Sequence, residues 1–192
     1  MRIFNKDLTA NFSFAVKTNV EAISCPMNEA TFEEIYEKTA RPLLSYVARI
    51  SGNSALADDI VQETFLRYLR SPIKENNDAA IKSYLYKIAT NLVYDHFRKT
   101  QRENKWQLFS TKESASEIVD ETLPEESDMM RVFRNLKPQE RALLWLAYVE
   151  GYEHREIAAV LNLSAVSIKV LLFRARRKLA CLLEGEKVKN EV

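Results

Sequence analysis

The chain has 192 residues, 46% hydrophobic and 29% charged, which is ordinary for a globular protein of one domain or two small ones. Only three Gly and five Pro in this length predict an all-α fold with few tight turns. The formal net charge is +1, so a nucleic-acid partner would require positive charge gathered in patches.

The cysteine content argues against a metal centre. Cys25 and Cys181 lie far apart with no metal-binding spacing, so we expect no disulfide framework, no metal site and no cofactor. No run approaches eighteen apolar residues, and Asp7 and Lys17 interrupt the N-terminal segment, so we expect neither a membrane span nor a signal peptide. Reduced thiols and these absences predict a cytoplasmic protein without membrane insertion.

The first element follows an irregular N-terminal extension, residues 1–28, whose role the sequence leaves uncertain. The sequence Thr31-Phe-Glu-Glu34 forms a capping box and predicts the start of a helix. That helix is expected to stop near Ser51-Gly52, and Pro42 would bend it.

A second helix is predicted from Ser54 to Arg70. One face is apolar, and the opposite face is polar apart from Leu66. The apolar face carries Ala57, Ile60, Val61, Thr64 and Tyr68, and the outward face carries Asp59, Gln62, Glu63, Leu66 and Arg70. Residues 71–79 contain Pro72 and an Asn-Asn-Asp cluster, which predict a loop.

A long third helix is predicted from about Ala80 to beyond Arg102. Its expected core stripe is Ile81, Leu85, Ile88 and Leu92. Aromatic residues fall off that stripe beside basic and amide side chains, namely Tyr86, Tyr94 and Phe97 beside Lys87, Asn91 and Arg98. This pattern fits a stacking platform for unpaired bases, and packing of each ring on a neighbouring helix explains it equally well.

Charge changes sign sharply after the third helix. Residues 98–105 carry four basic side chains and one acid, whereas residues 112–128 carry seven acids and one lysine. The stretch from 105 to 126 is sparsely apolar and is expected to be a flexible acidic linker between two domains. A further helix is then expected through Met130, Phe133 and Leu136, and another starting at Pro138.

The last fifty residues follow a helix-turn-helix pattern. Ile157, Ala158 and Leu161 share one face of a short helix, and Asn162 stands where the chain must turn. Ser164 can cap a second helix whose apolar stripe is Ile168, Leu172, Ala175 and Leu179 and whose other faces are basic. Such a helix fits the major groove of DNA, and the alternative is an ordinary three-helix bundle with a solvated basic face.

Three segments in order resemble a known family. They are Asp58-Asp-Ile-Val-Gln-Glu-Thr-Phe-Leu66, Tyr84-Leu-Tyr-Lys-Ile-Ala-Thr-Asn-Leu-Val-Tyr-Asp-His-Phe-Arg98 and the helix-turn-helix. Together they look like a bacterial RNA polymerase sigma factor of the sigma-70 family, extracytoplasmic-function (ECF) group. A single motif would be weak, because helix-turn-helix units occur in many repressors, but three in this order are specific.

The resemblance implies a domain order. Residues 29–104 would be the sigma region 2 helical bundle, 105–126 the linker, 127–183 the sigma region 4 helix-turn-helix domain and 184–192 a C-terminal tail. The implied function is to bind core RNA polymerase and direct promoter-specific initiation, by recognising minus-35 duplex DNA and melting the minus-10 element. The implied partners are core polymerase, promoter DNA and an anti-sigma factor.

The resemblance also implies site residues. Core polymerase would bind the second helix through Asp59, Gln62, Glu63 and Leu66, although a solvated face is the plainer interpretation of those side chains. The minus-10 element would be read as single-stranded DNA, with a base flipped into the loop at 71–79. Asn91 matches a family position close to that DNA, and Tyr86, Tyr94 and Arg98 are further candidates.

The minus-35 contacts implied for the second helix of the helix-turn-helix are Ser167, Lys169, Phe173, Arg174, Arg176 and Arg177, the last two on phosphates. Val170 and Leu171 depart from the family, which often has Ser and a basic residue there. Either Leu171 fills the core, or base readout is altered through contact with thymine methyls. Glu153 replaces the usual Ser cap, and an acid there still suits the helix dipole.

No catalytic residue is expected. His96 and His154 are far apart in sequence and have no triad or metal partners nearby, so an enzyme is disfavoured. Two other hypotheses remain: a stand-alone helix-turn-helix regulator, which leaves the second and third helices unexplained, and a sigma-like decoy that occupies an anti-sigma factor without initiating transcription.

Overall fold

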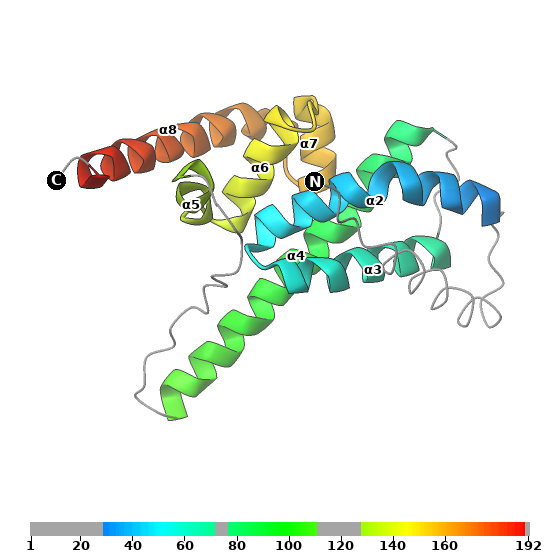
Figure 1. The fold of residues 1–192 in the computed structure, drawn as a ribbon, viewed down its shortest axis with the longest axis horizontal. Helices are drawn as coiled ribbons and strands as arrows, with labels where there is room; N and C mark the ends of the chain where they lie inside the picture. The colour runs from blue at the N-terminus through cyan, green and yellow to red at the C-terminus, as the bar shows by residue number, and fades with distance from the viewer. Residues whose placement is uncertain (1–28, 72–76, 111–127, 191–192) are drawn as a thin grey trace, which may run out of the picture.

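The structure, a computed structural model, describes residues 29–71, 77–110 and 128–190. All regular structure in these residues is helical, as the composition predicted, and Figure 1 shows the arrangement. The helices are α2 (Glu29–Ser51), α3 (Ser54–Arg70), α4 (Asp78–Ser110), α5 (Asp128–Arg134), α6 (Pro138–Tyr148), α7 (His154–Leu161) and α8 (Ala165–Asn190). The N-terminal extension, residues 72–76 of the loop after α3, residues 111–127, which include most of the expected linker, and residues 191–192 lie outside the described residues.

Helices α2 and α3 are joined by a tight turn. Gly52 has a φ of +74°, and its N–H donates to the Ala48 carbonyl oxygen at 2.9 Å. Asn53 then caps α3, because its Oδ1 accepts from the Leu56 N–H at 3.0 Å. The predicted bounds of α3 are confirmed, whereas α2 begins at Glu29, before the predicted capping box, so that Thr31 lies within the first turn.

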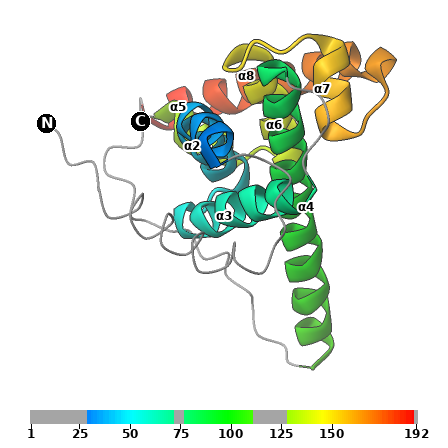
Figure 2. The same ribbon diagram turned by 90° about the vertical axis from the view of Figure 1, so that its right-hand side faces the viewer.

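Helix α4 is longer than predicted. It starts at Asp78 rather than Ala80 and continues to Ser110, into the segment expected to be the linker. Its N-terminal half packs against α2, α3 and α7. Its C-terminal half projects away from the other helices, as both ribbon views show (Figures 1 and 2).

Helices α5 to α8 form the second helical unit. Pro138 occupies the first turn of α6, as predicted, and the Glu140 carboxylate accepts from the Lys137 N–H at 2.8 Å. Helix α5 ends at Arg134, before Leu136. Helix α8 runs to Asn190, so residues 184–190, expected to be a tail, extend this helix.

The two helical units share one continuous core. Helix α6 packs on α2, and α7 packs on α4, which Figure 2 shows from the side. Buried residues of both units belong to the same hydrophobic cluster, among them Tyr46, Leu85, Tyr86, Leu146 and Ile157.

Arg141 of α6 reaches the turn between α2 and α3. Its side chain is buried, and a Cβ added at Gly52 would lie 3.1 Å from its Nη1. Position 52 therefore favours glycine for its backbone angle and for this close approach.

Among the described residues, no single helix is long and apolar enough to cross a membrane. Helix α7 and residues 165–185 of α8 meet the criteria of length and composition only as a pair bent by 93°.

Candidate nucleic-acid and polymerase interfaces

The turn between α7 and α8 has the geometry that the sequence predicted. Asn162 is left-handed, with φ 53° and ψ 48°, and it is the only non-glycine residue with positive φ in the described part of the chain. The Leu163 N–H donates to the Ala158 carbonyl oxygen at 2.9 Å. Ile157, Ala158 and Leu161 are buried, so the predicted packing face of α7 is confirmed.

The start of α7 is stabilised by an acidic cap. The Glu156 carboxylate accepts a hydrogen bond from the Glu153 N–H at 2.7 Å. Glu153 is the N-cap and Glu156 lies in the first turn, so both carboxylates stand at the N-terminus of α7, where they interact favourably with the helix dipole. The departure from Ser at position 153 therefore leaves the helix start intact.

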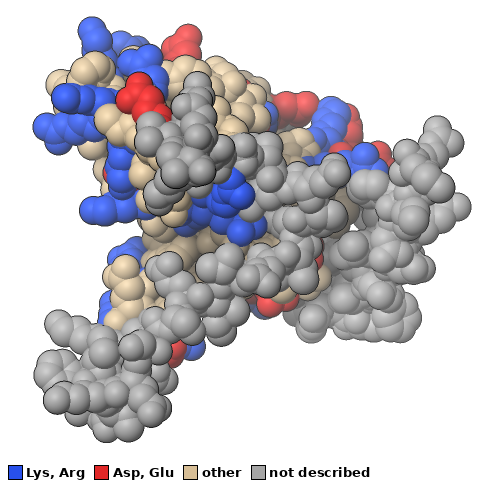
Figure 3. Space-filling model, turned by 60° about the vertical axis from the view of Figure 1, so that its left-hand side comes forward, with Lys and Arg blue, Asp and Glu red and all other residues tan. Residues whose placement is uncertain are grey.

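Helix α8 presents a buried face and a basic exposed face. Ile168, Leu172 and Ala175 are buried, as predicted. All six candidate minus-35 residues are exposed, namely Ser167, Lys169, Phe173, Arg174, Arg176 and Arg177. Figure 3 shows Lys and Arg gathered on the upper part of one face, the level at which α5, α6 and α8 lie in Figure 1.

Most cations of α8 have no acidic partner among the described residues. No salt bridge there involves Lys169, Arg174, Arg176 or Arg177, whereas Lys178 pairs with Glu140 at 2.7 Å. Burial raises the pKa of Glu140, but the hydrogen bonds from Lys178 and the Lys137 N–H outweigh it, so the pKa lies below its usual value. Lys178 therefore ties α8 to α6, and the four unpaired cations remain available to an anion.

The two unusual positions on α8 face different surroundings. Leu171 is partly buried and packs against the core, so the simpler of its two interpretations is confirmed. Val170 points outward and is 50% exposed. Only Val170 remains as a candidate for altered base readout.

The outward face of α3 has the predicted composition. Asp59 and Gln62 are exposed, and Leu66 is partly exposed, while the predicted inward residues are buried. Glu63 accepts from the Arg67 Nε–H at 2.7 Å one turn away. The face therefore offers carboxylate and amide groups around one apolar side chain.

The minus-10 candidates on α4 are in three different environments. Asn91 and Arg98 are exposed, and the Arg98 Nη2 pairs with the Asp95 Oδ1 at 3.1 Å. Tyr94 is half-buried, and its hydroxyl has no hydrogen-bond partner among the described residues. Tyr86 is fully buried beneath Tyr46 and Tyr152, so it is not exposed to DNA in this arrangement of the helices.

Two family models match the chain. The sigma-70 region 2 model matches residues 35–103, and the sigma-70 region 4 model matches residues 127–179. EcfG of Rhodopseudomonas palustris is a relative that aligns with this chain over most of its own length. The two are 30% identical over 142 residues, which cover 73% of this chain and 78% of EcfG. The chain belongs to the ECF group of sigma-70 family RNA polymerase sigma factors. Regions 2 and 4 are the parts through which this non-enzymatic family directs transcription initiation.

Other comparisons agree with this placement. BldN of Streptomyces coelicolor, an ECF sigma factor, is 30% identical over 170 residues, covering 81% of this chain, which spans only 61% of BldN. The structure of the sigma factor RpoE in complex with the anti-sigma factor NepR from Bartonella quintana has a similar fold, with a TM-score of 0.63 and 24% identity. The structural match covers 80% of this chain and 96% of the RpoE chain.

The junction between regions 2 and 4 contains a charged group that the sequence did not reveal. The Glu150 carboxylate, 7% exposed, pairs with Lys82 Nζ at 2.9 Å and accepts from the Trp145 Nε1–H at 3.1 Å. Lys82 also lies 5.6 Å from the ring centroids of both Tyr86 and Tyr152. Burial raises the pKa of Tyr152 to about 12. Because Lys82 and Glu150 are distant in sequence, no local pattern predicted the pair.

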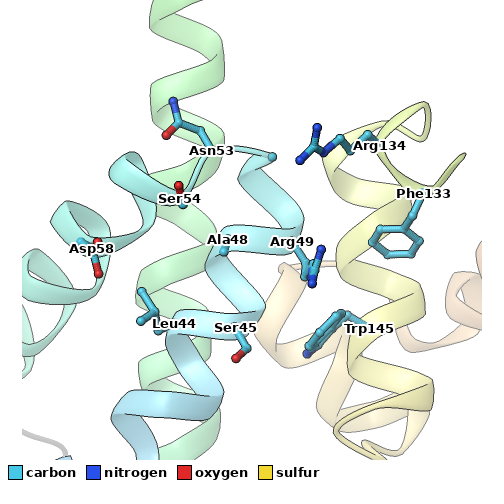
Figure 4. Close-up of a pocket in the computed structure, with 11 residues that line it drawn as sticks. Leu44, Ser45, Ala48, Arg49, Asn53, Ser54, Asp58, Phe133, Arg134 and Trp145 are labelled. Carbon is cyan, nitrogen blue, oxygen red and sulfur yellow. The ribbon is translucent and has the colours of Figure 1, made fainter. Parts of the chain in front are cut away.

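A groove lies beside this junction, with a volume of about 330 Å³. It is lined on one side by α2 and the start of α3 and on the other by α5 and α6, and it holds apolar and basic side chains together with the carboxylate of Asp58. Figure 4 shows Leu44, Ala48 and Arg49 of α2 opposite Phe133, Arg134 and Trp145. The groove therefore has residues of region 2 on one wall and residues of region 4 on the other.

Proposed function

We propose that this chain binds core RNA polymerase and directs promoter-specific initiation in the cytoplasm, by recognising the minus-35 element as duplex DNA and melting the minus-10 element. The main support is the exposed face of α8, where four cations lack acidic partners among the described residues. That face follows a left-handed turn of the kind that sets a recognition helix against its neighbour.

The minus-35 contacts divide into two kinds. Lys169, Phe173 and Arg174 are nearest the start of α8 and would approach base edges, because recognition helices read bases with their N-terminal residues. A bidentate Arg contact to guanine would contribute about 1–3 kcal/mol of discrimination. Arg176 and Arg177 would contact phosphates and set the salt dependence of binding.

The minus-10 contact is the exposed part of α4 from Asn91 to Arg98. Both of these residues are exposed, and the Arg98–Asp95 pair is open to solvent, so a phosphate can replace Asp95 at little cost. Tyr94 keeps part of its ring accessible for stacking. Tyr86 is fully buried in this arrangement and is not among these contacts.

The polymerase contact is the outward face of α3. Leu66 would be its apolar anchor, surrounded by Asp59, Gln62 and Glu63, an arrangement typical of an interface anchor within a polar rim. The substitution Leu66→Glu is expected to weaken core binding about 30-fold or more, as for a hot-spot residue, without changing helical content.

A matched control for Leu66→Glu is Val149→Glu, which adds the same charge at another exposed apolar position, 59% exposed, outside α3. Core binding is measured by fluorescence titration and helical content by circular dichroism. Similar losses of binding in both variants, or a loss of helicity in the first alone, would remove Leu66 from the interface.

An anti-sigma factor is the further partner that we propose. A structure of similar fold holds such a complex, and the groove beside the junction offers apolar walls with Arg49 and Arg134. An amphipathic helix with acidic residues beside its apolar stripe would be complementary to this groove.

In vitro transcription separates this proposal from its alternatives. The purified chain is mixed with core polymerase and a library of promoter fragments, and both complex formation and start-site-specific transcripts are measured. A sigma factor gives both. Duplex binding without core binding would indicate a stand-alone regulator, and core binding without transcripts would indicate a decoy.

A further inference from the structure

An apolar strip runs along the exposed face of α8. Val166 is 87% exposed, Val170 50% and Phe173 57%, whereas the neighbouring Ile168 and Leu172 are buried. The spacings of four and three residues place the three side chains on one side of the helix. Single exposed apolar residues are common on proteins, but a strip at helical spacing is characteristic of a contact surface.

Cations flank this strip on both sides. By helical periodicity, Lys169 and Arg176 lie along one edge, Arg174 lies along the other, and Arg177 continues the midline. When a helix enters a major groove, the midline of its first turns lies deepest and faces the base edges, whereas long side chains on its flanks, and those further along the helix, can reach bases or phosphates. The midline of the first two turns of α8 is therefore apolar where hydrogen-bonding side chains would normally read bases.

Only one base presents an apolar group in the major groove. Thymine carries its C5 methyl there, whereas cytosine presents an amino donor and both purines present polar atoms. We infer that Val166, Val170 and Phe173 form a thymine-reading strip that selects an upstream element by contact with thymine methyls. This inference rests on the proposed function, since it requires α8 to enter the major groove of promoter DNA.

The strip has the length of a short run of base pairs. Phe173 lies seven positions after Val166, which is about 10.5 Å along the helix axis. That distance corresponds to roughly three base-pair steps. A cytosine opposite the strip would lose a hydrogen-bond partner for its amino group, so the strip both attracts thymine and rejects cytosine.

Flanking charge favours DNA over a protein occupant for this strip. Described α8 side chains include five cations and one acid, Glu184, and four of the cations have no acidic partner among the described residues. The backbone charge of DNA would neutralise both flanks at once. A protein partner would need two rows of acids separated by an apolar row.

The test removes single methyl groups from the DNA. Holoenzyme assembled from the full chain and core polymerase first selects an upstream element from promoter duplexes randomised at that position. Each selected thymine is then replaced by deoxyuridine, which lacks only the C5 methyl. We expect affinity to fall about fourfold for each contacted methyl, which corresponds to about 0.8 kcal/mol.

Protein variants assign the methyls to side chains. In the Val170→Ala variant, deoxyuridine in place of the thymine that Val170 contacts in the wild type should change the affinity for DNA less than twofold. The matched control Val149→Ala, at an exposed valine outside α8, should keep the full fourfold effect. A selected element without thymines, or deoxyuridine effects that are absent or unchanged in Val170→Ala, would overturn the inference.

Two earlier steps of the same experiment, formation of the holoenzyme and enrichment of an upstream sequence, test the proposed function separately. Failure to form holoenzyme, or failure to enrich any upstream sequence, would refute the proposed function and the inference with it. Enrichment of an element whose binding depends on Arg174 but not on thymine methyls would refute the inference alone.

Discussion

The ion pair between Lys82 and Glu150 is expected to hold regions 2 and 4 together. Glu150 is 7% exposed and Lys82 33%, and their Nζ and Oε2 atoms are 2.9 Å apart. At an effective dielectric constant of about 20, the attraction at that distance is about 6 kcal/mol. Solvent at the partly exposed Lys82 screens part of this attraction, and contacting ion pairs typically couple by a few kcal/mol at most, so the expected coupling energy is about 1–3 kcal/mol.

A double-mutant cycle measures this coupling. Glu150→Gln keeps an oxygen for the Trp145 Nε1–H while removing the charge, and Lys82→Met keeps an unbranched stem beside the tyrosine rings. Urea unfolding of the wild type, both single variants and the double variant gives four free energies of unfolding. Trp145 fluorescence, read in a Trp106→Phe background, reports whether the junction opens before the helices unfold.

A second cycle provides the control. Arg67 and Glu63 form an exposed pair one turn apart on α3, 49% and 38% exposed at 2.7 Å, and such pairs contribute about 0.3–0.5 kcal/mol. If the coupling energy of Lys82 with Glu150 is no larger than that of this exposed pair, burial does not strengthen it. The ion pair would then not be what holds the two regions together.

Two further predictions concern region 4. Asn162→Ala should lower the free energy of unfolding by about 1 kcal/mol, because alanine resists the left-handed conformation of this residue. Asn162→Gly should leave that free energy nearly unchanged. Equal thermal midpoints for the two variants would contradict this prediction. Glu140, whose folded pKa is below its ordinary value, contributes stability that is present above the ordinary carboxyl pKa and is lost as pH falls through the folded pKa. Glu140→Gln should therefore flatten the loss of stability toward acid in urea titrations, and an unchanged acid limb would disprove the role assigned to its bond with Lys178.

Helix α3 shows why part of the fold was predictable. Its bounds follow from local signals, an Asn cap before Ser54 and a clean separation of apolar from polar positions. The turn at Asn162 was predictable for the same reason, because the conformational preference belongs to that residue alone. These features depend on interactions within a few residues.

Helix α4 shows why the rest was not predictable. A single apolar stripe describes a helix that packs on one side, but α4 is covered by α2 and α3 and also by α7. Tyr86 therefore lies against Tyr46 of α2, with ring centroids 4.8 Å apart, and against Tyr152, 5.9 Å away. Residues that make contact only after the two regions pack together leave no periodic signal in the sequence, which also explains why Glu150 and Arg141 were missed.

The position of Tyr86 leads to a consequence for DNA binding. The junction contacts α4 at Lys82 and Tyr86, whereas Asn91 and Arg98, further along the helix, are exposed. Contacts at Asn91 and Arg98 are therefore compatible with the closed arrangement of the two regions. A contact at Tyr86 requires region 4 to separate, because Tyr152 covers that ring from the region 4 side. Protection of Tyr86 from solvent in the free protein, compared with its accessibility in the promoter complex, thus distinguishes a closed sigma factor from an open one.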